Sequence, residues 1–307
     1  MIRFIYPDKE NAPELLLLCP ENEAGKVART LILDLLSEEE DGVDIAVCFA
    51  YGTFLVRRFY EEYEFTYPLA LDEGADVEQA LSSIEEYAKR HELPLLYGDL
   101  TAEEQGALAK RYRLSRTEEF DISEEDEKPE MIYRLSVLTP CDILEELPTL
   151  CDGELTLDAI TEEDIPSYAL LCRDEEILEV WGVDYRDIDP DMSDRDFFEG
   201  IVDEFERGIA LTLAVRYSGR LVGEIALYAF DGRGGAEFSI RIFRGYHKNG
   251  YGARALALLF AYAKEELMLE HVDGICLCEN IPSRRLMEKH MTLVSDDGEM
   301  VKYRICL

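Results

Sequence analysis

A turn with two glycines joins a strand-like segment to a long apolar helix in the second half of the chain. The turn spans His247–Arg254 and reads HKNGYGAR, and strong helix formers with apolar spacing follow it. Glycines there let backbone N–H groups approach a ligand, and a helix start leaves donors unpaired. With Lys248 adding positive charge, and His247 and Arg254 nearby, the stretch predicts a phosphate-type anion site. Taken alone, a bare G-x-G fits a tight turn before a packed helix equally well.

The pattern of strands and helices falls into two similar halves. An acidic run at 124–130 and a mixed stretch with two prolines separate them, and an alternating strand then restarts the pattern. We expect one domain at 1–140, a linker at 141–152 and a second domain at 153–307. In each half several strands precede a main helix, which leads to a further strand, helix and strands. This order predicts an α/β chain with sheets of mixed direction and an internal structural duplication.

Several elements of the second half should frame the glycine turn. We expect strands at Glu154–Ala159, Ala210–Tyr217, Arg220–Phe230, Ala236–Phe243 and Val272–Cys278, and helices at Asp194–Arg207, Gly252–Glu270 and Ser283–Lys289. The first half should carry helices near 24–36, 77–90 and 102–112.

The acidic composition limits the partners. Asp and Glu number 67 against 31 Lys and Arg, a formal net charge of -36. This argues against nucleic acid or an anionic membrane as the main partner and suits an amine, although a merely soluble protein can be equally acidic. The eight cysteines form no C-x-x-C pair, which favours free thiols over disulfides or a metal site. Because the chain shows no signal peptide and no membrane-spanning run, we expect a cytoplasmic protein.

The order of strand, G-x-G turn, helix, strand and then ENIPSRRLMEK resembles the GNAT superfamily of acetyl-CoA-dependent N-acyltransferases. The family signature Q/R-x-x-G-x-G/A falls on His247–Gly252, and the N-x-x-S element falls on Asn280–Ser283. The segment AEFSIRI, residues 236–242, resembles the fourth family strand. The resemblance covers about Gly153 to Leu307. It implies a mixed, mostly antiparallel twisted sheet flanked by helices, and direct attack of a substrate amine on acetyl-CoA, with CoA as product.

The resemblance also implies a cofactor site. Backbone amides of the glycine turn would bind the pyrophosphate, an exposed strand edge would pair with the pantetheine arm, and Ser283 would either cap the next helix or contact the cofactor. The implied cofactor-binding residues are Ile240, Ile242, His247, Lys248, Asn249, Gly250, Tyr251, Gly252, Ala253, Asn280 and Ser283.

Catalytic and acceptor residues are implied in the same way. Glu237 lies where many family members carry a general base, which would take the amine proton directly or through water. The alternative is an exposed Glu237 that pairs with Arg241 on the same strand face. Between the first two strands of this half, Trp181, Asp184 and Tyr185 would form an acceptor pocket suited to a cationic amine. The alternative there is a surface loop with a packed Trp181.

Three positions depart from the family pattern. His247 stands where the family has Gln or Arg, and Lys248 replaces a glycine that often follows. Met287 replaces the tyrosine that often protonates the leaving thiolate. Since methionine cannot donate a proton, no general acid carries over, and a slow or inactive enzyme is an open alternative.

The first half departs further. Its segment Ala80–Tyr112 resembles, in pattern, the acyltransferase-like half of aminoacyl-lipid synthases. The turn that would correspond to the phosphate site, Asp72–Asp76, holds one glycine and three acids, which would repel a pyrophosphate. We therefore expect a degenerate GNAT-like domain that binds no CoA and that shapes the acceptor site or an interface.

The leading hypothesis is thus a tandem N-acetyltransferase with one cofactor per chain, acting on a small or protein amine. The alternative is a CoA-binding or structural module with lapsed catalysis. A third candidate, an aminoacyl-transferase that uses charged tRNA, conflicts with the net charge of -36. The acceptor, and the choice between monomer and homodimer, are left open by the sequence.

Overall fold

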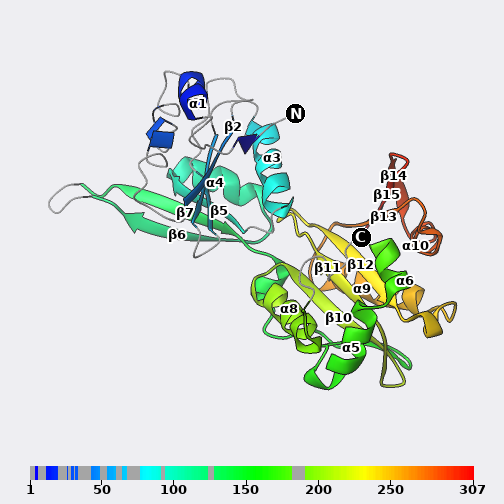
Figure 1. The fold of residues 1–307 in the computed structure, drawn as a ribbon. Helices are drawn as coiled ribbons and strands as arrows, with labels where there is room; N and C mark the ends of the chain where they lie inside the picture. The colour runs from blue at the N-terminus through cyan, green and yellow to red at the C-terminus, as the bar shows by residue number, and fades with distance from the viewer. Residues whose placement is uncertain are drawn as a thin grey trace. The chain divides into compact units, whose positions relative to one another are not determined.

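The chain divides into two compact units, Met1–Leu138 and Thr139–Leu307 (Figure 1). The structure is a computed structural model. It describes residues 4–5, 12–19, 26, 29–30, 32–33, 43–48, 54–59, 64–67, 77–90, 94–123, 128–181 and 191–307.

The described part of the N-terminal unit forms a sheet of seven strands in the order β1-β2-β3-β4-β5-β7-β6. Strands β4 and β5 are parallel, and the other neighbouring pairs are antiparallel. The strands are β1 (Phe4–Ile5), β2 (Val43–Cys48), β3 (Phe54–Phe59), β4 (Glu64–Tyr67), β5 (Leu95–Leu100), β6 (Ser115–Asp121) and β7 (Met131–Val137). The helices are α1 (Ala12–Leu18), α3 (Val77–Arg90) and α4 (Ala102–Arg111).

The C-terminal unit forms a sheet of eight strands in the order β14-β15-β13-β12-β11-β10-β9-β8. The strands are β8 (Leu150–Asp152), β9 (Leu155–Asp158), β10 (Ala210–Tyr217), β11 (Arg220–Tyr228), β12 (Gly235–Ile242), β13 (His271–Leu277), β14 (Thr292–Asp296) and β15 (Met300–Cys306). The α-helices are α5 (Ile165–Cys172), α6 (Glu175–Trp181), α8 (Asp194–Glu206), α9 (Tyr251–Glu265) and α10 (Ile281–Met287). Short 3-10 turns are η1 (Pro140–Ile143), η2 (Glu162–Asp164) and η3 (Arg244–Tyr246).

The stretch 141–152, which we expected to be a linker, contributes to the second sheet. Within it β8 pairs antiparallel with β9, and Cys141 of η1 is buried in the core of the C-terminal unit. The division between the units therefore lies before this stretch, after Leu138.

Both sheets follow one strand order around a single parallel pair. In the C-terminal unit β12 and β13 are parallel, joined by α9, and β13 is followed by α10 and the antiparallel pair β14–β15. In the N-terminal unit β4 and β5 take the same places, joined by α3 and followed by α4, β6 and β7. The predicted mixed, mostly antiparallel sheet is confirmed for the C-terminal unit, and the internal duplication remains a prediction.

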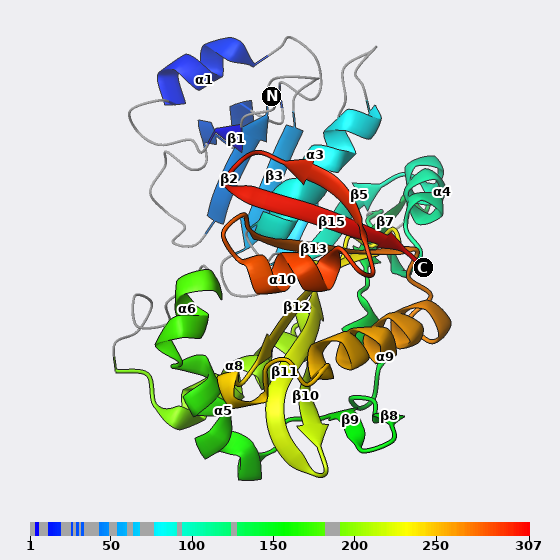
Figure 2. The same cartoon turned by 90° about the vertical axis from the view of Figure 1, so that its right-hand side faces the viewer.

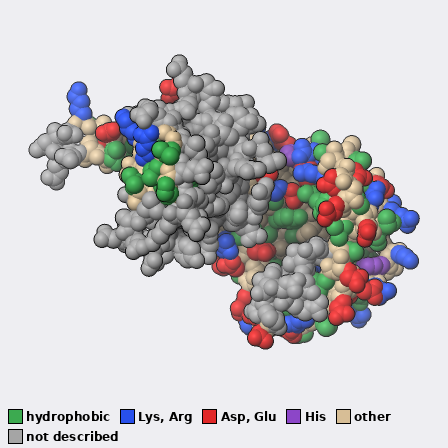
Figure 3. Space-filling view, turned by 45° about the horizontal axis from the view of Figure 1, so that its top comes forward, with side chains coloured by type: hydrophobic (Ala, Val, Ile, Leu, Met, Phe, Trp, Pro, Cys, Tyr) green, Lys and Arg blue, Asp and Glu red, His purple; other side chains and the backbone are tan. Residues whose placement is uncertain are grey.

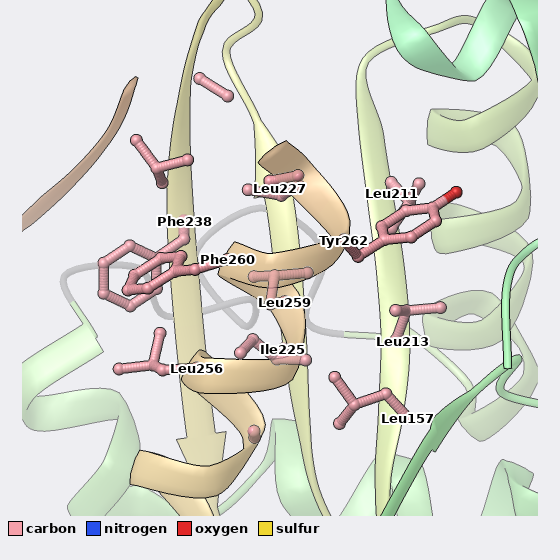
Figure 4. Packing of buried hydrophobic residues seen from close by; sticks show 14 of the residues in the cluster. Leu157, Leu211, Leu213, Ile225, Leu227, Phe238, Leu256, Leu259, Phe260 and Tyr262 are labelled. Carbon is pink, nitrogen blue, oxygen red and sulfur yellow. The ribbon is translucent and has the colours of Figure 1, made fainter. Parts of the chain in front are cut away.

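Helix α9 packs its apolar side on one face of the second sheet (Figure 4). Its residues Leu256, Leu259, Phe260 and Ala263 follow the helical spacing of three and four, which places them on one side. Phe260 meets Phe238 of β12 edge-on, with 5.7 Å between ring centroids. Each fully buried side chain of this size contributes about 1.5–3 kcal/mol, so this contact fixes α9 against β12.

Helix α9 ends five residues earlier than the sequence pattern predicts. The amides of Glu266 and Leu267 both donate to the carbonyl of Tyr262, and Met268 adopts a left-handed conformation with φ of 56°. The chain then turns back, so that Leu269 donates to the carbonyl of Ala263. This ending also buries Leu269, which explains why the apolar pattern continues past the helix.

The opposite face of the second sheet is covered by α5 and α8, which lie side by side in Figures 1 and 2. Alternation along β10 separates the two layers: Leu213 joins the α9 cluster, whereas Ala214 joins a cluster with residues of α5 and α8. Ser193 caps α8 in a capping box with Asp196, which explains why the helix begins where predicted. The sheet is thus the middle of three layers.

Candidate active site

Strand β12 has an open edge near its C-terminal end. It pairs with β13 only through Gly235–Phe238, while its pairing with β11 continues to Ile242. The amide of Phe243 donates to the carbonyl of Val222 in β11. Odd-numbered residues of β12 therefore face β11, and the backbone groups of even-numbered residues turn to the side from which β13 diverges. The N–H and C=O groups of Ile240 and Ile242 therefore lie on an edge that an extended chain can pair with.

The turn after β12 is held by its own side chains. His247 Nε2 lies 2.8 Å from the carbonyl oxygen of Ile242 and, as the partner is an acceptor, donates to it. Asn249 Nδ2 donates to the carbonyl of Tyr246 at 3.1 Å. Lys248 and Gly250 have φ angles of 64° and 81°, which reverse the chain. His247 and Asn249 thus shape the turn, and the Ile242 carbonyl already has one donor.

The start of α9 presents unpaired backbone donors. The first intrahelical bond runs from the Arg254 amide to the Gly250 carbonyl, at 3.1 Å. The amides of Tyr251, Gly252 and Ala253 precede it, and the cap residue Gly250 has no side chain to bind them. The first turn of α9 also contains no acidic side chain. These groups can bind an anion at the positive end of the helix.

The structure needs glycine at one of the two glycine positions of the turn and not at the other. Gly250 needs its left-handed φ of 81°, although an added Cβ would meet nothing within 4 Å. At Gly252 an added Cβ would make ordinary contacts, at 3.5 Å to Leu286 and 3.6 Å to Ile240. Backbone conformation therefore requires glycine at Gly250, whereas internal packing requires it at neither position.

Arg254 does not add free charge to the turn, which corrects the sequence prediction. Its Nε binds Asp152 Oδ2 at 2.6 Å, and its Nη2 donates to the Asp152 carbonyl at 2.5 Å. Arg254 instead ties α9 to β8. Lys248, which is exposed, is the cation that remains next to the helix start.

Asn280, and not Ser283, caps α10. The Asn280 side-chain oxygen accepts the Ser283 amide at 3.1 Å. The capping role expected for Ser283 is therefore wrong, because Ser283 is the third residue of the helix and supplies the donor. The cap uses the Asn280 oxygen and not its Nδ2 group.

Glu237 is buried, and its carboxylate faces Lys302. Its residue is 7% exposed, so the alternative of an exposed strand glutamate is wrong. Its carboxylate lies 4.0 Å from Lys302 Nζ on β15, whereas Arg241 binds Glu224 of β11 at 2.5 Å. Glu237 thus lies on the sheet face opposite α9, next to Asp273 across the parallel pair.

Two buried polar groups occupy this face of β12, one on each side of Ser239. Towards one end, Arg241 joins Glu224 and donates to Cys172 Sγ of α5 at 3.2 Å. This contact fixes α5 over the sheet. Towards the other end, Glu237 lies beside Asp273. Ser239 therefore marks the middle of this face, where the open edge begins.

The position of the missing tyrosine is filled by an apolar core residue. Met287 is 1% exposed, and its sulfur would lie 2.5 Å from a Cβ added to Gly274. The thioether closes the space over β13 and offers no proton. The absence of a general acid at this position therefore remains after the fold is known.

The predicted acceptor residues are only partly described. Helix α6 packs against β13 and ends at Trp181, whose side chain lies outside the described residues together with Asp184 and Tyr185. Glu176 of α6 forms an ion pair with Arg244 of η3. This pair links the predicted acceptor wall to the turn after β12.

Sequence reasoning missed three residues of this site: Asp273, Lys302 and Arg304. They come from β13 and β15, which lie side by side in antiparallel register. Their alternation with apolar residues predicts strands, but only the strand order brings them to Glu237.

The described part of the chain lacks two further features. Its helices include none with the length and apolar character needed to cross a membrane. It holds no cluster of three or more metal-binding side chains. On the face of the C-terminal unit seen in Figure 3, acidic and basic side chains are interspersed.

The C-terminal half of the chain is similar to known proteins. Residues 154–290 match the family model of the acetyltransferase (GNAT) domain. No curated protein matches the chain. Among solved structures, a probable acetyltransferase is 21% identical with a TM-score of 0.45, covering 52% of this chain and 97% of its own.

Two further structures are similar at lower identity. The RimL ribosomal L7/L12 alpha-N-protein acetyltransferase in complex with coenzyme A is 15% identical with a TM-score of 0.46, covering 52% of this chain and 98% of its own. The spermidine N-acetyltransferase from Vibrio cholerae is 18% identical with a TM-score of 0.42, covering 50% and 96%. The family match thus identifies a GNAT acetyltransferase domain at residues 154–290 of this chain.

Proposed function

We propose that the C-terminal unit transfers an acetyl group from acetyl-CoA to a primary amine by direct attack. The observation that carries this proposal is the GNAT domain at residues 154–290, whose open strand edge leads straight into the glycine turn. Acetyl-CoA supplies an activated acetyl thioester, and the chain supplies binding groups and a proton acceptor.

The cofactor would lie along the open edge of β12. The main-chain groups of Ile240 and the amide of Ile242 suit the peptide-like pantetheine arm. The amides at the start of α9, with Lys248 beside them, suit the pyrophosphate. Asn280 Nδ2 is a further donor from the loop after β13. The amides needed for both contacts lie on one continuous strand–turn–helix segment, which supports this arrangement.

Glu237 would act as the general base. Its carboxylate is buried on the sheet face that also carries Ser239, next to the open edge. An attacking ammonium group must lose a proton, and a carboxylate within reach, or one water away, can accept it. The acceptor would then approach between this face and α6, and the amine could belong to a small molecule or a protein.

A CoA-binding module with lapsed catalysis is the second candidate, and Met287 is the observation that favours it. The family position for a proton donor is filled by a thioether that is 1% exposed. A thiolate is a tolerable leaving group, so this loss lowers the expected rate without excluding the reaction.

Free-thiol release separates the two candidates. Full-length protein would be mixed with acetyl-CoA and a panel of amines: a polyamine, an aminoglycoside, amino acids, a peptide with a free α-amine and a lysine peptide. We expect amine-dependent thiol release with at least one class. CoA binding without thiol release from any amine would favour the lapsed module, and no CoA binding would contradict both.

For the N-terminal unit we propose a GNAT-like domain that binds no cofactor. Its strand order, which matches that of the C-terminal unit, supports the kinship. Its expected phosphate turn, Asp72–Asp76, lies outside the described residues. The acidic sequence of that turn supports the lack of a cofactor site.

A further inference from the structure

A tyrosine lies beside Glu237 on the sheet face opposite α9. Tyr228 is the last residue of β11, and it is level with Glu237 of β12 across the antiparallel pair. Side chains that are level in such a pair point to the same face of the sheet and are close neighbours. Tyr228 therefore lies on the face from which the acceptor would approach.

The hydroxyl group of Tyr228 is accessible and has no bond partner within the described ranges. Strand β11 is buried from Leu221 to Leu227, and Tyr228 is the half-buried residue at which it emerges. The buried polar atoms that lack a hydrogen bond in the described part of the chain do not include this hydroxyl. Since the hydroxyl of a buried tyrosine usually has a partner inside the protein, this one is available to a ligand.

Tyr228 also borders the open edge of β12. Pairing with β13 ends at Phe238, and the next residue on the face of Glu237 is Ser239, which is diagonal to Tyr228 across β11 and β12. Diagonal neighbours lie roughly 7–8 Å apart, within reach of an aromatic side chain. Because serine is small, the Ser239 side chain does not separate the Tyr228 ring from the edge along which the cofactor would lie.

The chemistry of this hydroxyl suits an amine. Burial, and then the neighbouring Glu237, raises the pKa of Tyr228 above its ordinary value, so that the side chain stays neutral at ordinary pH. A neutral tyrosine oxygen keeps lone pairs that accept hydrogen bonds. A primary ammonium group has three N–H donors and no acceptor, and it therefore fits between oxygen atoms.

We propose that Tyr228 is an acceptor-binding residue, whose hydroxyl oxygen accepts a hydrogen bond from the substrate amine and holds that amine beside Glu237 at the open edge. The inference rests on the proposed function, because it takes the acceptor to be an amine that enters on this face. It adds a contact from β11, a strand that carries none of the site residues expected from the sequence. The contact recognises the nitrogen itself and so serves a small or a protein amine.

Steady-state kinetics test this contact through Tyr228→Phe, which removes the hydroxyl and keeps the ring. The KM for the amine should rise about tenfold, the usual loss for one hydrogen bond to a charged group. The calorimetric affinity for CoA should stay unchanged, which also shows that the variant is folded. Tyr262→Phe, on α9 at the other face of the sheet, is the matched control and should leave the KM unchanged. An unchanged KM in Tyr228→Phe for every amine that the protein acetylates would overturn the inference.

A binding measurement that needs no turnover separates this inference from the proposed function. Full-length protein with carbon-13 at the tyrosine Cζ atoms would be loaded with CoA and titrated with spermidine, alaninamide, Nα-acetyl-lysine amide and any further amine that it acetylates. The Tyr228 signal is assigned by its loss in Tyr228→Phe. We expect at least one amine to shift this signal and to leave the Tyr262 signal in place.

The outcomes of the titration keep the two claims apart. A shifted Tyr228 signal in a protein that acetylates no amine would support the contact and contradict the proposed transfer. An unmoved signal with an amine that the protein acetylates would overturn the contact and leave the transfer intact. An unmoved signal without any transfer would contradict both.

Discussion

The two units share a strand order and differ at the helix that links their parallel strands. In the C-terminal unit α9 begins with open amides and no acid, and α10 meets it through Leu286 near Gly252. In the N-terminal unit α3 carries Glu78 in its first turn. The start of α9 therefore favours an anion, whereas the start of α3 already carries an acidic side chain of its own.

Arg111 joins α4 to α3 by charged contacts in the N-terminal unit. From the end of α4 it reaches α3, where its Nε and Nη2 bind the two carboxylate oxygens of Glu85 at 2.8 and 3.0 Å. It also donates to Ser82 at 3.1 Å and pairs with Glu78. The Arg111 side chain is 6% exposed. One topology thus accommodates either a helix start open to an anion or a helix pair that neutralises its own charges.

The largest effect should come from the residue that gives the C-terminal unit its proposed chemistry. Glu237→Gln should lower kcat by about 10²–10⁴-fold and leave CoA affinity unchanged, because it removes a proton acceptor and no cofactor contact. Initial rates and calorimetry would check this. Glu119→Gln, an exposed strand glutamate of the N-terminal unit, is the control and should keep the full rate. An unchanged rate in Glu237→Gln across pH would remove Glu237 from the mechanism.

The next largest effect should be the loss of stability when the Arg111 contact is removed. Arg111→Ala should destabilise the N-terminal unit by about 2 kcal/mol, since it leaves Glu85 half-buried without its bidentate partner. Hydrogen exchange of the α3 amides measures this. Arg254→Ala breaks the exposed pair with Asp152 and should hardly change exchange in α9. Equal effects in the two helices would contradict the contrast between them.

Much of the contrast between the two units could be predicted from the sequence, because it depends on residues that are close together in the chain. Period-two strands, the glycine turn and the apolar spacing of α9 each depend on neighbours along the chain. The pairing of Arg254 with Asp152, or of Arg241 with Glu224, depends on which strands become adjacent. The burial of Glu237 has the same origin, because its cover and partners come from distant segments. Period-two spacing therefore did not reveal that Glu237 is buried.

The two glycines of the turn provide a smaller test. Gly250→Ala should cost about 1 kcal/mol, because alanine is strained at a left-handed φ, whereas Gly252→Ala should be nearly neutral. Thermal unfolding of the two variants measures the difference. A larger loss in Gly252→Ala would mean that α9 and α10 are packed more tightly than the contact with Leu286 indicates.

The smallest effect concerns acid stability. The folded-state pKa of Asp273 lies below its ordinary value, so its ionised form favours folding. This contribution is fully present above the unfolded-state pKa and is lost as the pH falls through the folded-state value. Asp273→Asn should therefore flatten the acid limb of stability against pH, as measured by denaturant unfolding between about pH 2 and 6. An unchanged acid limb would show that the ion pairs of Asp273 with Lys302 and Arg304 contribute nothing to folding.

The number of CoA molecules bound per chain tests the central claim most directly. Calorimetric titration of the full-length protein with CoA should give one site per chain, and Lys248→Glu should weaken it by placing a negative charge beside the pyrophosphate. Two sites per chain would contradict the claim, and so would a single site that Lys248→Glu leaves unchanged.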